Sequence, residues 1–491
     1  MTEIIGETTQ VKSIKKNYLY NLLYQIVTIV SPMITAPYIS RVLGAENIGI
    51  YSFVAANTTY FLLVGTFGLS TYSQFEVAKL REDKSEVSQL FVESCATRVV
   101  TFGGCGLLFY VFVLLRGGQY VAYYTIQAVL LFSHMIDITW LFQGFEDFGR
   151  IALKNCVIRA ITVVLIFVFV KRRSDLAAYF WISAGGALAG NLSIIPGIRK
   201  YLSFQSLGKI NILKHLRQSS VYFLPSIASV LISTVDKLMI GYHNVSKVEN
   251  GYYEQAVKIE NMIFMIFASL NITMRPRMAY LFKAKRTEEI KTRMMKSLRF
   301  VSLLVFAMSF GLFAISDSFV DIYYGEGYKP VSLLLKIMTF WIVIKSFSSC
   351  VCEQYVMPND GMVRMNKSIW VAAVTNIVFN SIMIPKHGAV GAAIASVISE
   401  VSFYLIIRHY ARDVYSVKDF IYMVYKHVLS AFVMIIAIFF IGRLLQPSLL
   451  SLIITVFTGA VVYCCALTLL RDNQFHECKE VIRQKLRARL Q

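Results

Sequence analysis

The chain has 491 residues, of which 56% are hydrophobic and 16% are charged, and its formal net charge is +20. Soluble domains carry about 25% charged residues, whereas apolar runs of about 18 residues or more are typical of transmembrane helices. Such runs recur along the whole chain, so the composition excludes a soluble globular protein.

The apolar runs predict an all-α polytopic membrane protein with about fourteen transmembrane helices. In chain order they lie at residues 17–40, 47–73, 91–115, 119–142, 151–170, 176–197, 218–241, 252–274, 299–317, 331–352, 366–385, 388–407, 427–445 and 449–470. The polar start, residues 1–16, does not resemble a cleaved signal peptide, so we expect the first span to remain in the protein.

Basic residues gather on one side of the predicted membrane. With the N-terminus placed inside, most Lys and Arg fall in the inner loops and the tail, and the outer loops hold few. The positive-inside rule therefore predicts that both termini are cytoplasmic. This placement explains most of the net charge without a nucleic-acid partner.

The predicted loops are too short for a soluble catalytic domain, a P-loop or a glycine-rich dinucleotide turn. The 8 cysteines have neither the spacing of a disulfide framework nor that of a zinc site. We therefore expect no catalytic residues, no metal and no cofactor. Movement of a substrate across the membrane is the expected activity.

The chain repeats itself weakly. Residues 49–51 (GIY) and 251–253 (GYY) each open a span after an outer loop, and a proline interrupts the preceding span in both copies, at Pro32 and Pro225. Such ordered matches predict two six-helix bundles related by a pseudo-two-fold axis along the membrane normal.

These bundles set the expected domain organisation, with the substrate site between them. The predicted parts are a cytoplasmic N-terminus at 1–16, bundles at 17–197 and 218–407, a cytoplasmic linker at 198–217, two extra transmembrane helices within 427–470 and a basic cytoplasmic tail at 471–491.

Charged residues inside the spans are the candidate site. A charge at the centre of a bilayer costs about 2.5–3.5 kcal/mol or more, so it is expected to face protein or water. The expected substrate-binding residues are Arg41, Arg159, Lys237, Lys258 and Lys345. The expected residues for ion coupling or charge balance are Asp137, Asp236, Glu254 and Glu400.

These charges predict a cavity that leans cationic, which suits an anionic substrate, while its amides, hydroxyls and tyrosines suit sugars. Asp236 and Lys237 are expected to line the outer part of the cavity, with Arg41 at about the equivalent place in the first half. The alternative, that such polar residues only hold helices together, stays open.

Four segments carry a resemblance to a known family. They are KNYLYNLLYQIVTIVSPMITAPYISRVLGAENIGIYSF, STVDKLMIGY, VENGYYEQAVKIENM and IPKHGAVGAAIASVISE. They resemble the polysaccharide transporter, or oligosaccharide flippase, family of the multidrug/oligosaccharidyl-lipid/polysaccharide exporter superfamily. The resemblance runs from about residue 15 to about residue 470.

The resemblance implies a carrier that moves a polyprenyl-pyrophosphate-linked oligosaccharide from the cytoplasmic to the outer face of a bacterial plasma membrane by alternating access. It implies cavity charges at Arg41, Asp236 and Lys237, and a prenyl tail lying against the two extra helices. Our hypothesis is that Lys237 holds the phosphate charge and that Asp236 balances Lys237 in the empty carrier. The implied partners are the lipid-linked oligosaccharide, membrane lipid, a glycan polymerase and glycosyltransferases.

Two other functions stay open at this point. One is an ion-coupled exporter of drugs or metabolites from the same superfamily. The other is a membrane-embedded glycan polymerase or ligase, which should carry a large outer loop with catalytic residues.

Overall fold

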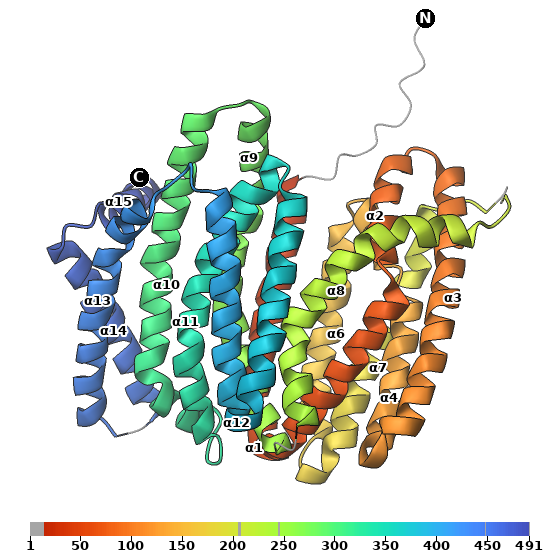
Figure 1. The fold of residues 1–491 in the computed structure, drawn as a ribbon, viewed down its shortest axis with the longest axis horizontal. Coiled ribbons are helices and arrows are strands. Elements are labelled where there is room, and N and C mark those ends of the chain that lie inside the picture. Colours follow the sequence, from red (N-terminus) through yellow and green to blue (C-terminus); the bar gives the residue numbers. More distant parts are fainter. Residues whose placement is uncertain (1–13, 205–207, 244–245, 447, 491) are drawn as a thin grey trace, which may run out of the picture. The chain divides into compact units, whose positions relative to one another are not determined.

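The computed structural model describes residues 14–204, 208–243, 246–446 and 448–490, and every regular element in these ranges is a helix (Figure 1). The α-helices are α1 (Ile14–Thr66), α2 (Leu69–Leu80), α3 (Lys84–Arg116), α4 (Val121–Met135), α5 (Thr139–Gly144), α6 (Phe148–Phe169), α7 (Leu176–Ile194), α8 (Ile212–Tyr242), α9 (Lys247–Lys283), α10 (Thr287–Tyr323), α11 (Lys329–Val351), α12 (Met362–Tyr410), α13 (Val417–Leu444), α14 (Leu449–Leu469) and α15 (Asn473–Leu490). The predicted all-α fold of a multi-pass membrane protein is confirmed.

Two glycines divide the longest helices. Among the described residues, 12 helices are long and apolar enough to cross a membrane. The backbone bends inside α1 at Gly44, with φ of 78°, and inside α12 at Gly388, with φ of 53°. Glycine tolerates positive φ because it has no Cβ. Counting both arms of α1 and α12, the described helices supply the fourteen predicted spans.

Two predicted spans end differently in the structure. The span predicted at 47–73 stops at Thr66, where Phe67 and Gly68 adopt positive φ and α2 begins in a new direction. The span predicted at 119–142 is split into α4 and α5 on either side of Asp137. Hydropathy alone did not reveal these breaks because the flanking residues are apolar.

Contacts divide the chain into two compact units. Unit 1 comprises Met1–Leu43 and Phe53–Val230, and unit 2 comprises Gly44–Ser52 and Leu231–Gln491. The division falls inside α8, whereas the sequence placed it at the linker 198–217. Residues 1–13 of the predicted N-terminus and residues 205–207 of that linker lie outside the described residues.

A buried polar network organises unit 1. Glu93 on α3 accepts hydrogen bonds from Gln89 Nε2 at 2.9 Å and from the backbone N of Asn211 at 3.1 Å. Its other carboxylate oxygen lies 2.6 Å from His215 Nε2, and His215 Nδ1 lies 2.9 Å from the Tyr72 hydroxyl. The network therefore ties the first turn of α8 to α2 and α3.

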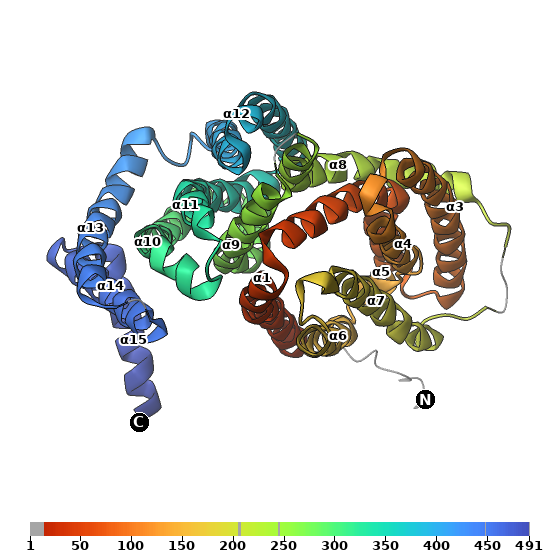
Figure 2. The same cartoon turned by 90° about the horizontal axis from the view of Figure 1, so that it is seen from below.

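Unit 2 is built around α11, which packs against α9, α10 and α12 (Figure 1). The helices α13 and α14 pack against each other and against α10, and Figure 2 shows them at one edge of this unit. The Tyr463 hydroxyl on α14 donates to the Leu303 carbonyl on α10 at 2.9 Å. The two extra helices predicted from sequence are therefore attached through α10.

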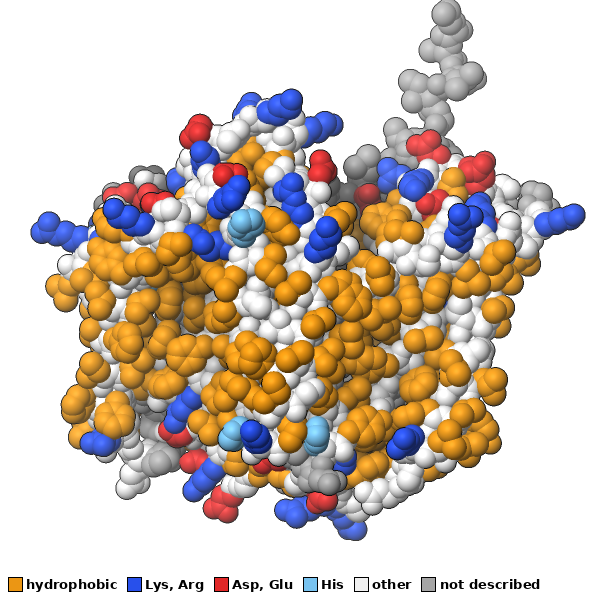
Figure 3. Space-filling view, viewed as in Figure 1, with side chains coloured by type: hydrophobic (Ala, Val, Ile, Leu, Met, Phe, Trp, Pro, Cys, Tyr) orange, Lys and Arg blue, Asp and Glu red, His pale blue; other side chains and the backbone are white. Residues whose placement is uncertain are grey.

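Large hydrophobic side chains cover the outer faces of the helices. Leu107 and Leu114 on α3 are both 66% exposed. Figure 3 shows hydrophobic side chains over the middle of the helices and charged side chains gathered toward the helix ends. This pattern is expected of surfaces that face lipid.

Candidate functional site

Asp236 on α8 is the centre of a buried polar cluster in unit 2. Its Oδ2 accepts hydrogen bonds from the Tyr253 hydroxyl at 2.5 Å and from Ser396 Oγ at 2.8 Å, and its Oδ1 accepts one from Asn380 Nδ2 at 2.5 Å. Asn380 also donates to Asn376 Oδ1 at 3.0 Å. Asp236 is only 4% exposed, and its partners among the described residues are hydroxyl and amide groups. A carboxylate in such surroundings keeps its charge at a cost, since none of these partners is a cation.

Lys237 belongs to a different cluster. Its Nζ lies 2.7 Å from Glu254 Oε2 on α9, and Lys258 Nζ lies 3.6 Å from Glu254 Oε1. Ser52 Oγ also donates to Glu254 Oε2, at 2.8 Å. The expected balance between Lys237 and Asp236 is therefore replaced by a balance between Lys237 and Glu254. Adjacent residues point about 100° apart on a helix, so the two side chains meet different neighbours.

The side chains of the second cluster are partly exposed. The side chain of Lys237 is 18% exposed and that of Lys258 is 25% exposed, while Glu254 is 13% exposed. One carboxylate shared by two ammonium groups leaves net positive charge in a partly buried site. An anion that reaches this place would gain charge-assisted hydrogen bonds.

Lys345 lies at the middle of the span Lys329–Asn359. Its Nζ is 3.7 Å from the centroid of the Trp341 ring and 4.7 Å from that of Phe264. It interacts electrostatically with Glu260 on α9 and with Glu400 on α12. Glu400 in turn accepts a hydrogen bond from Ser348 Oγ.

The balance of charge inside unit 2 differs from the overall expectation of a cationic cavity. In this unit the intramembrane acids that form these clusters outnumber the lysines. The acids are Asp236, Glu254, Glu260 and Glu400, and the lysines are Lys237, Lys258 and Lys345. The positive charge is therefore local, at the Lys237–Lys258 pair, rather than spread over the unit.

The remaining expected site residues belong to unit 1. Arg41 is exposed on α1, three residues before the bend at Gly44, and Arg159 is exposed at the middle of α6. Asp137 Oδ1 accepts hydrogen bonds from the Thr139 backbone N at 2.9 Å and from Thr139 Oγ1 at 2.5 Å. The Asp137 carbonyl accepts one from Arg98 Nη1 at 2.7 Å. Asp137 thus has a structural role at the start of α5 that the sequence did not predict.

Several residues of the clusters were missed from sequence. They are Tyr253, Asn376, Asn380, Ser396, Phe264 and Trp341. The two asparagines four residues apart in an apolar span carried a usable signal, because amides at helical spacing inside a membrane face protein or water. Trp341 lies four residues before Lys345, the spacing at which helical side chains meet.

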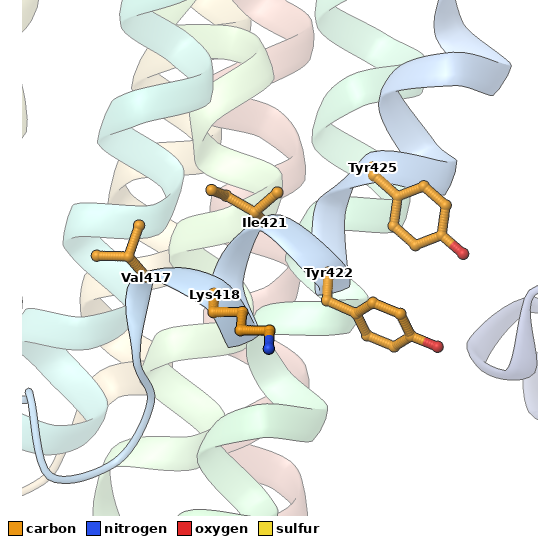
Figure 4. A pocket seen from close by; sticks show the side chains of 5 residues that line it. All are labelled: Val417, Lys418, Ile421, Tyr422 and Tyr425. Carbon is orange, nitrogen blue, oxygen red and sulfur yellow. The ribbon is translucent and has the colours of Figure 1, made fainter.

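A shallow hollow of about 570 Å³ lies elsewhere in unit 2, at the start of α13. Figure 4 shows its lining side chains projecting from α13. They are Val417, Lys418, Ile421, Tyr422 and Tyr425. The hollow is mostly apolar and contains none of the predicted site residues.

Comparison with known proteins places the chain in a family. A family model described as "Polysaccharide biosynthesis protein" matches residues 14–282, which is more than half of the chain. The chain belongs to this family. A second family model, MatE, matches residues 222–382. The resemblance seen in the sequence is therefore confirmed.

Curated relatives cover most of the chain. It is 24% identical over 397 residues to "Putative O-antigen transporter" of Escherichia coli (strain K12), covering 79% of this chain and 94% of that protein. It is 23% identical over 371 residues to "Probable low-salt glycan biosynthesis flippase Agl15" of Haloferax volcanii, covering 75% of this chain and 77% of that protein. Both are named as transporters or flippases, in agreement with the expectation of a non-enzymatic activity.

Solved structures share the fold. Lipid II flippase MurJ, in an inward closed conformation, aligns with a TM-score of 0.69 at 15% identity over 93% of this chain and 99% of that one. A multidrug resistance MATE family transporter aligns with a TM-score of 0.61 at 14% identity over 81% of this chain and 95% of that one. At these identities the likeness shows the fold alone.

Proposed function

We propose that the protein is a flippase that moves a polyprenyl-pyrophosphate-linked oligosaccharide from the cytoplasmic to the outer face of a bacterial plasma membrane. The observation that carries the proposal is the cluster in which Lys237 and Lys258 share Glu254 inside membrane-spanning helices. Family membership and the names of the curated relatives support it.

The chemistry of the substrate matches this cluster. A pyrophosphate and its sugars cannot cross hydrocarbon unaided, because each unsatisfied polar group costs several kcal/mol. In our proposal Lys237, Lys258 and Lys345 bind phosphate, and the prenyl tail stays in the lipid. Arg41 and Arg159 are proposed as substrate-binding residues of unit 1. The carrier alternates between inward-open and outward-open states, so water never forms a continuous path.

Asp236 is proposed to couple transport to an ion. Its carboxylate is buried among neutral hydroxyl and amide groups, so a proton or a sodium ion would relieve an uncompensated charge there. Glu400 is a second candidate for this role because it lies near Lys345. Asp137 remains a candidate for charge balance in unit 1.

The proposed setting follows from the charge distribution. Both termini are proposed to be cytoplasmic, and glycosyltransferases and a glycan polymerase are proposed to act before and after the flippase. The tail after α14 is basic, which suits an anionic inner leaflet.

Depletion of the protein in its host tests the proposal. We expect the lipid-linked oligosaccharide to accumulate on the cytoplasmic leaflet while early glycosyltransferase activity stays intact. Sided labelling of the sugar with a membrane-impermeant oxidant in intact and inverted vesicles measures this. Arrest of glycan assembly before completion in isolated membranes would instead favour an enzyme.

A second candidate is an exporter of cationic drugs or metabolites. The excess of acids over lysines among the clustered intramembrane residues of unit 2 and the MatE match favour it. Many such substrates are cations, so their transport should survive the loss of Lys237 and Lys258. Transport of an anionic lipid-linked oligosaccharide should not.

A further inference from the structure

The Lys345 ammonium rests on aromatic rings in the middle of a membrane span. Trp341 and Phe264, which together we call the aromatic cage, lie with their ring centroids 6.4 Å apart at an interplanar angle of 65°. Lys345 Nζ lies 3.7 Å from the Trp341 centroid and 4.7 Å from the Phe264 centroid. Within the described ranges, Lys345 forms no ion pair within 4.0 Å. The ring faces are therefore its close partners.

Two acids lie near this lysine but do not bind it directly. Glu260 and Glu400 interact with it electrostatically, and Glu400 is occupied by Ser348. Glu260 is 4% exposed, and no hydrogen bond reaches its carboxylate from the part of the chain that the structure describes. The ammonium thus sits in a favourable field without a charge-assisted hydrogen bond.

Such an arrangement holds a cation loosely. A cation–π contact is weaker than a charge-assisted hydrogen bond to an anionic oxygen. A phosphate oxygen that came within reach of Lys345 would therefore compete successfully with the rings. The flexible four-carbon stem of lysine allows its ammonium to change partner without movement of the helix.

We propose that the aromatic cage is a resting position for the Lys345 ammonium in the empty carrier, from which a phosphate group of the substrate withdraws it. The inference rests on the proposed flippase function and adds Trp341 and Phe264 as residues that set the affinity for phosphate. Loss of a ring destabilises the empty state more than the bound state. The affinity for phosphate should therefore increase. Ordinary damage to a binding site would decrease it.

The test uses the full chain in lipid nanodiscs with farnesyl pyrophosphate as the probe and farnesol as the phosphate-free control. We expect Trp341→Leu to bind farnesyl pyrophosphate on the order of tenfold tighter than wild type, with farnesol affinity unchanged. Trp341→Phe, which keeps a ring, should give a smaller gain. Lys345→Met should bind the probe more weakly. Trp370→Leu, at a half-buried tryptophan on α12, is the matched control and should retain wild-type affinity.

The double variant Trp341→Leu/Lys345→Met decides the mechanism. It should bind like Lys345→Met alone, because no ammonium remains to be released. The inference is overturned if Trp341→Leu weakens or leaves unchanged the affinity for the probe, or if its gain persists without Lys345. If Lys345→Met still weakens binding in that case, the flippase proposal survives alone. Equal affinity of wild type for farnesyl pyrophosphate and farnesol would overturn both.

Discussion

Gly49 and Gly251 each lie against the backbone of the other's segment. A Cβ on Gly49 would lie 1.7 Å from the Lys247 carbonyl oxygen, and a Cβ on Gly251 would lie 1.9 Å from the Ala45 carbonyl oxygen. The two glycines occupy equivalent places in the internal repeat, as do Ser52 and Glu254, which are bonded 202 positions apart. The repeat therefore creates a reciprocal contact of the small-residue type that lets membrane helices approach closely.

Alanine at either glycine should separate these segments. We expect Gly49→Ala and Gly251→Ala each to destabilise the protein by about 1–3 kcal/mol, because the clash is with rigid backbone. Thermal unfolding of the purified variants measures the loss. Gly106→Ala is the matched control, since nothing lies within 4 Å of the added Cβ on α3. Wild-type stability of Gly49→Ala would contradict the contact.

Loss of Lys237 should remove transport but not insertion. Lys237→Ala leaves Glu254 with Lys258 alone and places an anion near the substrate phosphate, a mismatch of about 2–5 kcal/mol in a desolvated site. We expect normal membrane abundance, no export, and part of the activity in Lys237→Arg. Normal export by well-expressed Lys237→Ala would end the phosphate hypothesis.

Exchanging the charges of Lys237 and Glu254 tests whether Lys237 binds the substrate or only holds α8 to α9. If Lys237 and Glu254 only hold α8 to α9, Lys237→Ala should be poorly folded and the swapped variant Lys237→Glu/Glu254→Lys should regain abundance and export. In our proposal both variants reach normal abundance, and the swapped variant does not regain export. Quantitative blotting beside the export assay distinguishes the two outcomes.

Changes at Asp236 should affect turnover more than binding. Asp236→Asn keeps the shape of the side chain but removes the charge, so we expect substrate affinity near that of wild type and loss of the dependence of transport on a proton or sodium gradient. Asp236→Ala removes the acceptor that Tyr253, Asn380 and Ser396 share, at about 1–3 kcal/mol for each group left unsatisfied. Gradient-driven uptake into vesicles measures the first effect. Gradient-dependent transport by Asp236→Asn would exclude Asp236 as the coupling residue.

The network at the start of α8 should contribute to stability. Glu93→Ala removes the acceptor of Gln89, Asn211 and His215 in a buried site, so we expect a loss of at least about 1–3 kcal/mol on thermal unfolding. Glu86→Ala, at an exposed position on the same helix, should change little. Equal stability of the two variants would exclude this role for Glu93.

The topology can be tested with fusion reporters. A reporter that is active only outside the cytoplasm should be silent when fused after Arg471 and active when fused near Gly327. The opposite pair of results would overturn the proposed orientation.

The sequence by itself determined the class of fold. A bilayer leaves no partner for an unpaired backbone group, so long apolar runs can only be helices, and their number follows from their lengths. The same logic located the charged residues of the spans, and the repeat pointed to residues 49–51 and 251–253 as equivalent segments. These inferences need only the composition and spacing of residues along the chain, which can be read directly from the sequence.

Only the tertiary structure decided which charges meet. Asp236 and Lys237 are neighbours in sequence, yet one is bonded to Asn380 and the other to Glu254. Side-chain direction around α8 and the approach of α9 and α12 determine these partners, and neither is encoded in hydropathy. The aromatic cage around Lys345 likewise includes Phe264, which lies on another helix, α9. Which side chains bind one another depends on the packing of segments that are distant in sequence. Local composition does not report that packing.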